Sequence, residues 1–210
     1  MAYAIKEIFL TLQGEGAQTG RRAVFCRFSG CNLWSGREAD RASAQCQFCD
    51  TDFVGIDGTR GGRYATAREL TDAVAEEWGP DRTRRFVVLT GGEPLLQVDR
   101  DLIDALHREG FQIAVETNGT IEPPNGLDWI CVSPKANSEL RVHSGHELKL
   151  VYPQQNAPPE AFQSLAFEHF SLQPMDGPEL AGNIERAVKY CLRHPQWRLS
   201  LQTHKILDIR

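Results

Sequence analysis

The stretch from residue 85 to residue 116 constrains the fold most, because a strand, a helix and a second strand follow one another within it. Residues 85–89 predict a strand that is continuously apolar from residue 86, residues 98–109 repeat apolar side chains at helical spacing, and residues 111–116 are again mostly apolar. Strands that are joined through a helix pair in parallel, and such strands are buried on both faces. The chain is therefore expected to build a mainly parallel sheet that helices cover.

The rest of the chain repeats this alternation. Short β-rich runs predict further strands over residues 4–12, 22–28, 128–132, 147–152, 169–172 and 197–202. The capping box from Thr66 to Glu69 starts a helix that Gly79 ends. A last helix is expected over residues 178–193, with Leu180, Ile184, Val188 and Leu192 facing inward. Because 210 residues are fewer than the ~250 of a complete eight-unit barrel, we expect an α/β fold that forms a shortened, open barrel, with residues 1–210 in a single domain.

Charge and hydropathy narrow the class of partner. The 23 basic and 28 acidic residues leave a formal charge of -5, so the broad basic face that nucleic acids require is not expected. Apolar runs such as residues 86–89 are much shorter than the ~20 residues of a membrane span, and no signal peptide is recognised. We therefore expect a cytoplasmic protein that binds a small molecule and has no nucleic-acid or membrane partner.

Polar and glycine residues follow six of the expected strands. These strand ends are residues 12–16, 28–31, 90–94, 116–119, 133–135 and 173–176. Glycine and proline often do no more than close a strand, which explains most of these residues singly. In a parallel sheet, however, ligands bind at the carboxyl ends of the strands. The full set therefore predicts that six strand ends converge on one binding site.

Six cysteines stand at positions 26, 31, 46, 49, 131 and 191. A chain of this size without an export signal does not need a disulfide framework, which favours reduced thiols or a metal site. Cys131 and Cys191 stand alone in apolar stretches and are expected to be small buried side chains. Cys31, Cys46 and Cys49 share one segment, and the short gap between the last two lets both thiolates serve one metal centre.

Two kinds of metal centre fit this spacing. Zinc usually takes four ligands, so a zinc site would have to add Cys26, whose alternation with Val24 and Phe28 on a strand suits packing better. An iron–sulfur cluster with three protein thiolates would leave one iron open to a substrate or cofactor. Spacing alone leaves both interpretations open.

Several motifs make the chain resemble the radical S-adenosylmethionine (SAM) enzymes. Cys46-x-x-Cys49, with Phe48 before the last cysteine, and the run Gly-Gly-Glu-Pro at residues 91–94 are similar to signatures of that family. Fourteen residues separate Cys31 from Cys46 in place of the usual three, which resembles one branch of the 7-carboxy-7-deazaguanine synthases. The other shared motifs are residues 11–16, 27–34, 49–51, 116–119, 133–135 and 202–205. In this order they span nearly the whole chain.

The resemblance implies a partial radical SAM barrel that holds a 4Fe-4S cluster and SAM. Cys31, Cys46 and Cys49 would hold three irons, and SAM would chelate the fourth. The implied SAM contacts are Phe48, Cys49, Asp50, Gly92, Ser133, Pro134, Lys135, Gln173, Pro174, Met175 and Asp176. Glu93 is suggested as an acceptor for the ammonium group of SAM. The implied reaction converts 6-carboxy-5,6,7,8-tetrahydropterin to 7-carboxy-7-deazaguanine with loss of ammonia, an early step toward queuosine and related deazapurines. No side chain is expected to be catalytic, because the hard step belongs to the cluster and SAM.

The resemblance also implies a set of substrate contacts and a magnesium ion. The implied substrate contacts are Leu12, Gln13, Gly14, Arg27, Thr90 and the terminal carboxylate of Arg210. Arg27 suits the pterin carboxylate, because a guanidinium binds a carboxylate through two parallel hydrogen bonds. Glu15 and Glu116 are weaker candidates, since glutamates near strand ends are often solvated. The hydroxyl of Thr51 would bind Mg2+, an ion that keeps its waters and takes few protein ligands. The family further implies a homodimer, with flavodoxin or ferredoxin as the electron donor.

Two other functions compete with this one. A radical SAM activase that forms a glycyl radical on a partner protein would share the cluster and the Gly-Gly-Glu-Pro turn. It would leave Arg27 and the Gln13 loop without a pterin to bind. A non-catalytic zinc-binding domain would use Cys26 together with the three cysteines above, and it would hold zinc instead of iron and sulfide.

Overall fold

The computed structural model describes residues 2–210, and Met1, the first residue of the expected domain, lies outside them. Within this range one sheet contains nine strands in the order β3-β1-β2-β4-β5-β6-β7-β8-β9. The strands are β1 (Tyr3–Leu12), β2 (Arg22–Phe28), β3 (Gly62–Tyr64), β4 (Phe86–Gly91), β5 (Gln112–Thr117), β6 (Trp129–Val132), β7 (Ser144–Tyr152), β8 (Ala166–Pro174) and β9 (Trp197–Leu199). The α-helices are α1 (Ala67–Trp78), α2 (Arg100–Arg108), α3 (Leu180–Arg193) and α4 (Thr203–Leu207), and the 3-10 helices are η1 (Gly16–Gln18), η2 (Glu38–Ser43), η3 (Pro94–Leu96) and η4 (Pro159–Ala161).

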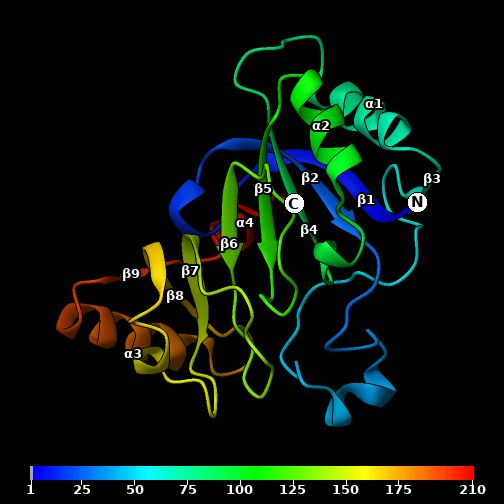
Figure 1. Ribbon diagram of the computed structural model, residues 1–210. Coiled ribbons are helices and arrows are strands. Elements are labelled where there is room, and N and C mark those ends of the chain that lie inside the picture. Colours follow the sequence, from blue (N-terminus) through cyan, green and yellow to red (C-terminus); the bar gives the residue numbers. More distant parts are fainter. Residues whose placement is uncertain (1) are drawn as a thin grey trace.

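Most of the sheet is parallel. Strands β2 and β4 to β9 run in one direction, whereas β1 lies antiparallel between β2 and β3. Because β3 and β9 are separate edges, the sheet does not close. In Figure 1, α1 and α2 lie together over one part of the sheet, and α3 lies near its other end, against β8 and β9. The expected open α/β fold with a mainly parallel sheet is confirmed.

Local sequence signals set the ends of the helices. The Thr66 hydroxyl accepts a hydrogen bond from the Glu69 backbone N–H at 3.2 Å, and Gly79 ends α1 with φ of 93°, as the capping box predicted. Asp99 accepts a hydrogen bond from the Leu102 N–H at 3.0 Å, so α2 begins slightly later than expected. Among residues 2–210, no helix has the length and apolar character that crossing a bilayer requires.

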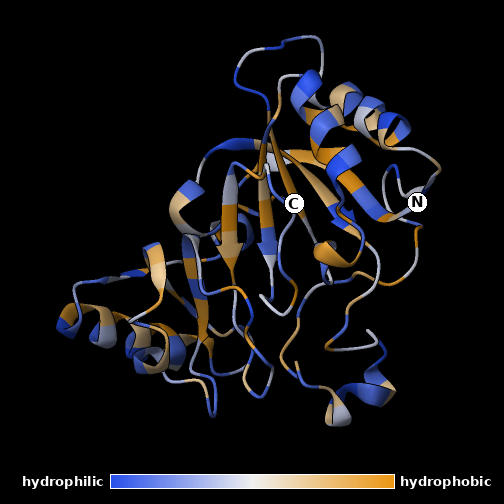
Figure 2. Cartoon of the chain, viewed as in Figure 1, coloured by the Kyte–Doolittle hydropathy of each residue, from blue (hydrophilic) through white to orange (hydrophobic). Residues whose placement is uncertain are grey.

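The core consists of two hydrophobic clusters. One lies among β1, β2, β4 and β5 beneath α1 and α2, and the other lies where β7 and β8 meet α3. Cys26 belongs to the first cluster and is fully buried, as its alternation with Val24 and Phe28 predicted. Figure 2 shows the central strands as mainly hydrophobic, whereas the outer faces of α1 and α2 are hydrophilic.

The inward face of α3 differs from the expected one. Its buried residues are Asn183 and Ala187, and Leu192 is 80% exposed, so the prediction that Leu192 faces inward was wrong. Each step of four residues turns a helix ~40° past a full circle, so repeated steps from Leu180 drift away from the sheet. Asn183 is buried because its amide donates a hydrogen bond to the Met175 carbonyl at 2.9 Å. This contact fixes α3 to the end of β8.

The carboxyl ends of the parallel strands lie at one edge of the sheet. In Figure 1, the arrows of β5 and β6 point toward this edge, and the long loop between β2 and β3 lies on the same side. The polar strand ends and the loop that carries Cys31, Cys46 and Cys49 therefore meet where a ligand site is expected.

Candidate active site

A cavity of about 350 Å³ opens at the carboxyl ends of the strands. This volume is typical of sites for small organic ligands. The predicted site residues that line it are Leu12, Gln13, Gly14, Arg27, Cys31, Cys46, Phe48, Cys49, Asp50, Thr51, Thr90, Gly92, Ser133, Lys135, Gln173, Pro174, Met175, Asp176 and Arg210. Pro134 is buried outside this lining, and its carbonyl accepts a hydrogen bond from the Gln154 amide at 3.2 Å. The predicted strand ends thus converge on one cavity.

Three thiols line one part of the cavity. Cys31 follows β2, and Cys46 and Cys49 come from the loop after η2. A hydrogen bond from the Cys46 thiol lowers the pKa of Cys49 to about 6, and the same bond raises the pKa of Cys46. Burial raises the pKa of Cys31. One side of the cavity is therefore lined with sulfur.

The arrangement of these thiols distinguishes between the two metal centres. Within the part of the chain that the structure describes, no three histidine, cysteine, aspartate or glutamate side chains are grouped as one metal ion would require. A 4Fe-4S cluster does not require such a group, because each thiolate binds a different iron. Cys26, the fourth ligand that zinc would need, lies in the hydrophobic core and not in the cavity lining. The donor set therefore fits a cluster and not a four-cysteine zinc site.

Gly91 and Gly92 bring the end of β4 against the start of the cysteine loop. Gly91 has φ of 138°, a conformation that side chains disfavour. A Cβ atom on Gly92 would lie 2.7 Å from the Cβ of Cys31 and closer still to the carbonyl oxygen of Gly30. The Glu93 N–H also donates a hydrogen bond to that oxygen at 2.9 Å. These glycines therefore allow the close approach that holds Cys31 at the cavity wall.

Glu93 is buried behind the wall and is not part of the cavity lining. Its carboxylate accepts hydrogen bonds from the Thr117 hydroxyl and the Asn118 N–H, both at 2.8 Å, and from the Leu95 N–H at 3.0 Å. Burial raises the pKa of Glu93 despite these bonds. The side chain therefore ties the turn after β4 to the end of β5.

Lys135 places an ammonium group near the thiols. Its Nζ donates hydrogen bonds to the carbonyl and hydroxyl oxygens of Ser133 at 2.6 and 2.7 Å. Burial lowers the pKa of Lys135, although Cys46 and Cys49 favour its charged form. The side chain is therefore a partner for negative charge at the sulfur-lined side of the cavity.

The C-terminal helix α4 joins two walls of the cavity. Lys205 Nζ lies 2.7 Å from Asp50 Oδ2 and 2.5 Å from Asp176 Oδ2. The Gln202 amide donates hydrogen bonds to Glu15 at 3.0 Å and to Asp50 at 3.2 Å. The motif at residues 202–205 was found in the sequence, but its contacts with the cysteine loop and the end of β8 were not predicted.

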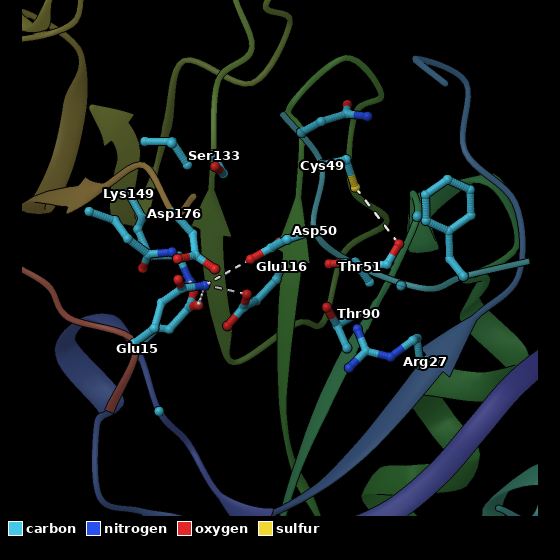
Figure 3. Close-up of a pocket in the computed structure, with 18 of the residues that line it drawn as sticks. Glu15, Arg27, Cys49, Asp50, Thr51, Thr90, Glu116, Ser133, Lys149 and Asp176 are labelled. Atoms are coloured by element: carbon cyan, nitrogen blue, oxygen red, sulfur yellow. Dashed lines mark hydrogen bonds and ion pairs between the residues drawn. The ribbon is translucent and has the colours of Figure 1, made fainter. Parts of the chain in front are cut away.

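Arg27 points into the cavity, as binding a carboxylate requires. Its Nε donates a hydrogen bond to Glu7 Oε1 at 2.8 Å, and no residue in the range 2–210 hydrogen-bonds its terminal nitrogens. Glu7 also pairs with the guanidinium of Arg210, whose carbonyl oxygen accepts a hydrogen bond from the Thr11 hydroxyl. The end of the chain thus folds back toward Arg27. In Figure 3, Thr51 and Thr90 lie on the same side of the cavity as Arg27.

The other side of the cavity holds a charge cluster of the buried Lys149 and the partly buried Glu15 and Glu116 (Figure 3). Lys149 Nζ lies 2.6 Å from Glu15 Oε2 and 3.1 Å from Glu116 Oε2. Burial opposes the charge on Lys149, but Glu116 and Glu15 raise the pKa of Lys149 well above its ordinary value. Glu15 and Glu116 are therefore ion-paired inside the cavity and not solvated at its rim.

Lys149 is the functional candidate that the sequence interpretation missed. The strand Glu-Leu-Lys-Leu-Val-Tyr at residues 147–152 was predicted, but its charges were not singled out. Glu147 and Lys149 alternate with Leu148 and Leu150 and so share one face of the strand. Two opposite charges on one face of a strand that is buried in a parallel sheet are the signal that would have found this residue.

Comparisons with known proteins agree with this site. Residues 40–143 match the model of the Radical SAM superfamily, a segment that contains Cys46 and Cys49 and begins after Cys31. Over all 210 residues and 100% of both chains, the sequence is 72% identical to a 7-carboxy-7-deazaguanine synthase from Bradyrhizobium diazoefficiens. It is 65% identical to a 7-carboxy-7-deazaguanine synthase from Bordetella pertussis, again over 100% of both chains. The crystal structure of QueE from Escherichia coli has a TM-score of 0.73 and 27% identity, and the match covers 96% of this chain and 94% of that one.

An open, mainly parallel sheet with three cysteines at the carboxyl ends of its strands defines a radical SAM enzyme, a class that uses a 4Fe-4S cluster and SAM. Within that class, the chain belongs to the 7-carboxy-7-deazaguanine synthase family. The zinc-binding alternative is wrong, because Cys26 packs in the core. The glycyl-radical activase is not supported, since the full-length relatives are synthases.

Proposed function

We propose that this chain converts 6-carboxy-5,6,7,8-tetrahydropterin to 7-carboxy-7-deazaguanine with loss of ammonia, on the way to queuosine or a related deazapurine. The observation that carries this proposal is the separation of two recognition groups within one cavity. Arg27 lies on one side, and Glu15 and Glu116 lie on the other (Figure 3). The pterin has a carboxylate at one end and amide and amino N–H groups at the other. A guanidinium suits the first end and carboxylates suit the second.

The cysteine side of the cavity would hold the cofactors. Cys31, Cys46 and Cys49 would each hold one iron, and SAM would bind the fourth iron through its amino and carboxylate groups. When bound, the cluster and SAM would supply the electron transfer and the radical chemistry that act at carbon 6 of the pterin. The proposed SAM contacts are residues 48–50, Gly92, residues 133–135 and residues 173–176.

Two features of the chain support these SAM contacts. The backbone at Gly92 carries no side chain, so it can lie directly against Cys31 at the cavity wall. The ammonium group of Lys135 lies near Cys46 and Cys49, where it offsets negative charge on the thiolates. The protein would therefore hold SAM and the pterin in a reactive orientation and exclude water from them.

The pterin carboxylate would bind the terminal nitrogens of Arg27. Among the Arg27 nitrogens, only Nε donates to Glu7, so the two terminal nitrogens that would bind a carboxylate are left for the cavity. The other proposed substrate contacts are Leu12, Gln13, Gly14, Thr90 and Arg210. All of these residues line the same cavity.

The hydroxyl of Thr51 would be the protein ligand of a Mg2+ ion. Thr51 lines the cavity on the side of Arg27. The neighbouring carboxylates of Asp50 and Asp52 are already paired, with Lys205 at 2.7 Å and with Lys6 at 2.9 Å. An ion at this place would take its remaining ligands from the substrate and from water, as Mg2+ commonly does.

Three further parts of the proposal rest on family resemblance and on cluster chemistry. Flavodoxin or ferredoxin would supply the low-potential electron, and the chain would act as a homodimer. The reducing environment of the cytoplasm would preserve the reduced thiols and the cluster. Size-exclusion chromatography with light scattering tests the dimer, and replacing dithionite with each purified electron carrier tests the donor.

The decisive experiment is an anaerobic assay of the reconstituted enzyme with dithionite, SAM, Mg2+ and 6-carboxy-5,6,7,8-tetrahydropterin. Mass spectrometry follows 5′-deoxyadenosine and 7-carboxy-7-deazaguanine in the same samples. We expect both products from the wild-type protein and neither from Cys46→Ala. Cleavage of SAM without a deazapurine product would contradict the proposed substrate and leave the radical SAM assignment in place.

A further inference from the structure

We propose that Lys149 is a positioning residue, which holds Glu15 and Glu116 as an ionised pair against the N–H groups of the bound pterin. The inference rests on the proposed function, because it assigns the carboxylates that would accept hydrogen bonds from the N–H groups of the proposed pterin substrate. In this assignment Lys149 acts through the two carboxylates and does not itself contact the reacting atoms.

The strand geometry directs Lys149 into the cavity. Leu148 and Leu150 on β7 pack in the core cluster beneath α3, so Lys149 lies on the opposite face of the strand. It is 5% exposed and lines the cavity together with Val151, the next residue on that face. Burial of the ammonium group is unfavourable, so this lysine needs negatively charged or hydrogen-bonding partners inside the cavity.

Each carboxylate of the pair is held at both of its oxygens. Glu15 binds Lys149 through Oε2 and accepts from the Gln202 amide through Oε1 at 3.0 Å. Glu116 binds Lys149 through Oε2 and accepts from the Gln13 amide through Oε1 at 2.8 Å. Lys149 thus joins two carboxylates from distant segments, and the glutamines fix their outer edges. Because each oxygen has a second lone pair, both carboxylates still accept from a ligand.

The charges around the pair make Lys149 necessary for its ionisation. Lys149 is the one lysine or arginine within ion-pair distance of Glu15 or Glu116 among residues 2–210. The other titratable groups that act on the pair or on Lys149 are Glu147, Cys131, His204 and Lys135, and Lys149 lowers the pKa of Lys135. Glu147 adds a third carboxylate, which accepts from the Ala17 N–H and the Ser171 hydroxyl. Without Lys149, Glu15 and Glu116 would both lose this counter-charge, and the pKa of Glu15 would rise.

The ionisation state decides whether the pair binds a pterin. An ionised carboxylate only accepts hydrogen bonds, so it matches the amide and amino N–H groups of the substrate. A protonated carboxyl carries an O–H donor, which would face the N–H donors of the pterin and weaken its binding. The pair therefore selects heterocycles that present N–H groups, provided that Lys149 keeps it charged.

The test compares the pH dependence of KM in Lys149→Met and wild-type holoenzyme. For the variant we expect a KM for the pterin that is about tenfold or more above wild type near neutral pH and that falls as the pH rises to about 9. The wild-type KM is expected to stay flat over that range. Lys149→Arg keeps the charge, so it is expected to restore the flat profile. A KM of Lys149→Met that runs parallel to wild type would overturn the inference.

Glu147→Gln is the matched control, since Glu147 is buried on the same strand and outside the cavity lining. Its amide can still accept from Ala17 and Ser171, so a loss of packing alone is expected to leave the KM profile flat. If Lys149→Met does not fold, the double variant Lys149→Met/Glu116→Gln replaces it in the test. The double variant removes one of the two carboxylates that repel each other without Lys149. The midpoint of the pH dependence of KM for the double variant is expected at a lower pH than for Lys149→Met, or below the measured range. A KM that still falls steeply above neutral pH in the double variant would contradict the pairing of Glu15 and Glu116.

Calorimetry supplies a readout that is independent of turnover. The holoenzyme is titrated with 7-carboxy-7-deazaguanine, which keeps the amide and amino groups, in two buffers of different ionisation enthalpy. Near neutral pH we expect about one proton to be released on binding to Lys149→Met and none on binding to wild type. Equal proton counts for the two proteins would overturn the inference. If the wild-type protein forms no deazapurine in the assay above, the proposed function is wrong. If it forms the product but the pH dependence of KM in Lys149→Met equals that of wild type, only the inference about Lys149 is wrong.

Discussion

The Nε atom of Arg27 lies 2.8 Å from Oε1 of Glu7, its cross-strand partner in the register of β1 and β2. Glu7 pairs through its other oxygen with Arg210 at the end of the chain. Because cross-strand pairs share one face of the sheet, β1 fixes the direction of the Arg27 guanidinium and anchors the C-terminus beside it. One carboxylate therefore organises the side of the cavity that is proposed to bind the pterin carboxylate.

Replacing Arg27 with lysine tests this arrangement. A lysine keeps the charge but lacks the planar fork, so we expect the KM for the pterin to rise by about 10- to 100-fold. Glu7→Gln keeps a hydrogen-bond acceptor and is expected to raise KM by a smaller factor. The rate of SAM cleavage without pterin serves as the control and is expected to stay near wild type in both variants. An unchanged KM in Arg27→Lys would exclude Arg27 as the carboxylate contact.

The cysteines give a second prediction, which concerns iron and sulfide content. After anaerobic reconstitution, Cys46→Ala is expected to lose most of its bound iron and sulfide, because two thiolates hold a cluster poorly. Cys26→Ala is the matched control, since Cys26 is a buried thiol of the core and lies outside the cavity. It is expected to retain near-normal iron and to lose only about 1 kcal/mol of stability. Loss of iron in Cys26→Ala with retention in Cys46→Ala would reverse the assignment of ligands.

Local patterns in the sequence predicted most of the fold and most of the cavity. The capping box at Thr66 and the apolar runs of β4 and β5 act over short distances, so they appear directly in the sequence. The strand ends converge because parallel strands place their carboxyl ends on one edge. The parallel sheet predicted where the cavity lies, and the family resemblance implied most of the residues that line it.

The features that were missed depend on contacts between distant segments. The three-residue strand β3 is too short to show a period, and it exists because Gly62–Tyr64 pairs with the start of β1. The face of α3 depends on a hydrogen bond from Asn183 to Met175, which no helical pattern contains. The role proposed for Lys149 depends on Glu15 and Glu116, which the fold brings within ion-pair distance of it. Such tertiary partners override local propensity.

Thr51 carries the prediction for magnesium. Thr51→Val removes the hydroxyl and keeps the shape of the side chain, so the Mg2+ concentration that gives half-maximal product formation is expected to rise by about tenfold or more. Thr51→Ser keeps the hydroxyl and is expected to remain close to wild type. The measurement is a Mg2+ titration of product formation at saturating SAM. Identical titrations for Thr51→Val and wild type would show that this hydroxyl does not bind the ion.

Gly92→Ala is expected to disturb the cysteine loop. The new methyl group would lie 2.7 Å from the Cβ of Cys31 and would collide with the backbone of Gly30. Overpacking of this kind costs about 1–3 kcal/mol, and here it would also displace a cluster ligand, so reduced iron loading is expected. Gly110→Ala is the control, because a Cβ built there meets no atom of residues 2–210 within 4 Å, apart from its chain neighbours, although φ is 79°. It is expected to lower stability through backbone strain and to leave iron loading unchanged, and equal loading in the two variants would argue against the collision.

The ion pair of Glu15 and Lys149 predicts how the stability of the cluster-free protein changes in acid. Burial alone would raise the pKa of Glu15, but the charge of Lys149 and the hydrogen bonds from Lys149 and Gln202 lower it to about 2. A carboxyl group whose pKa is lower in the folded than in the unfolded protein stabilises the fold fully above its unfolded value of 4.5 and loses this effect as the pH falls toward 2. We therefore expect Glu15→Gln to lower the free energy of unfolding near neutral pH, and the difference from wild type to shrink at about pH 3. Urea denaturation followed by circular dichroism measures both values, with the exposed Glu122→Gln as the control. A difference that is the same at both pH values would mean that the Glu15 carboxylate gains no stability from Lys149.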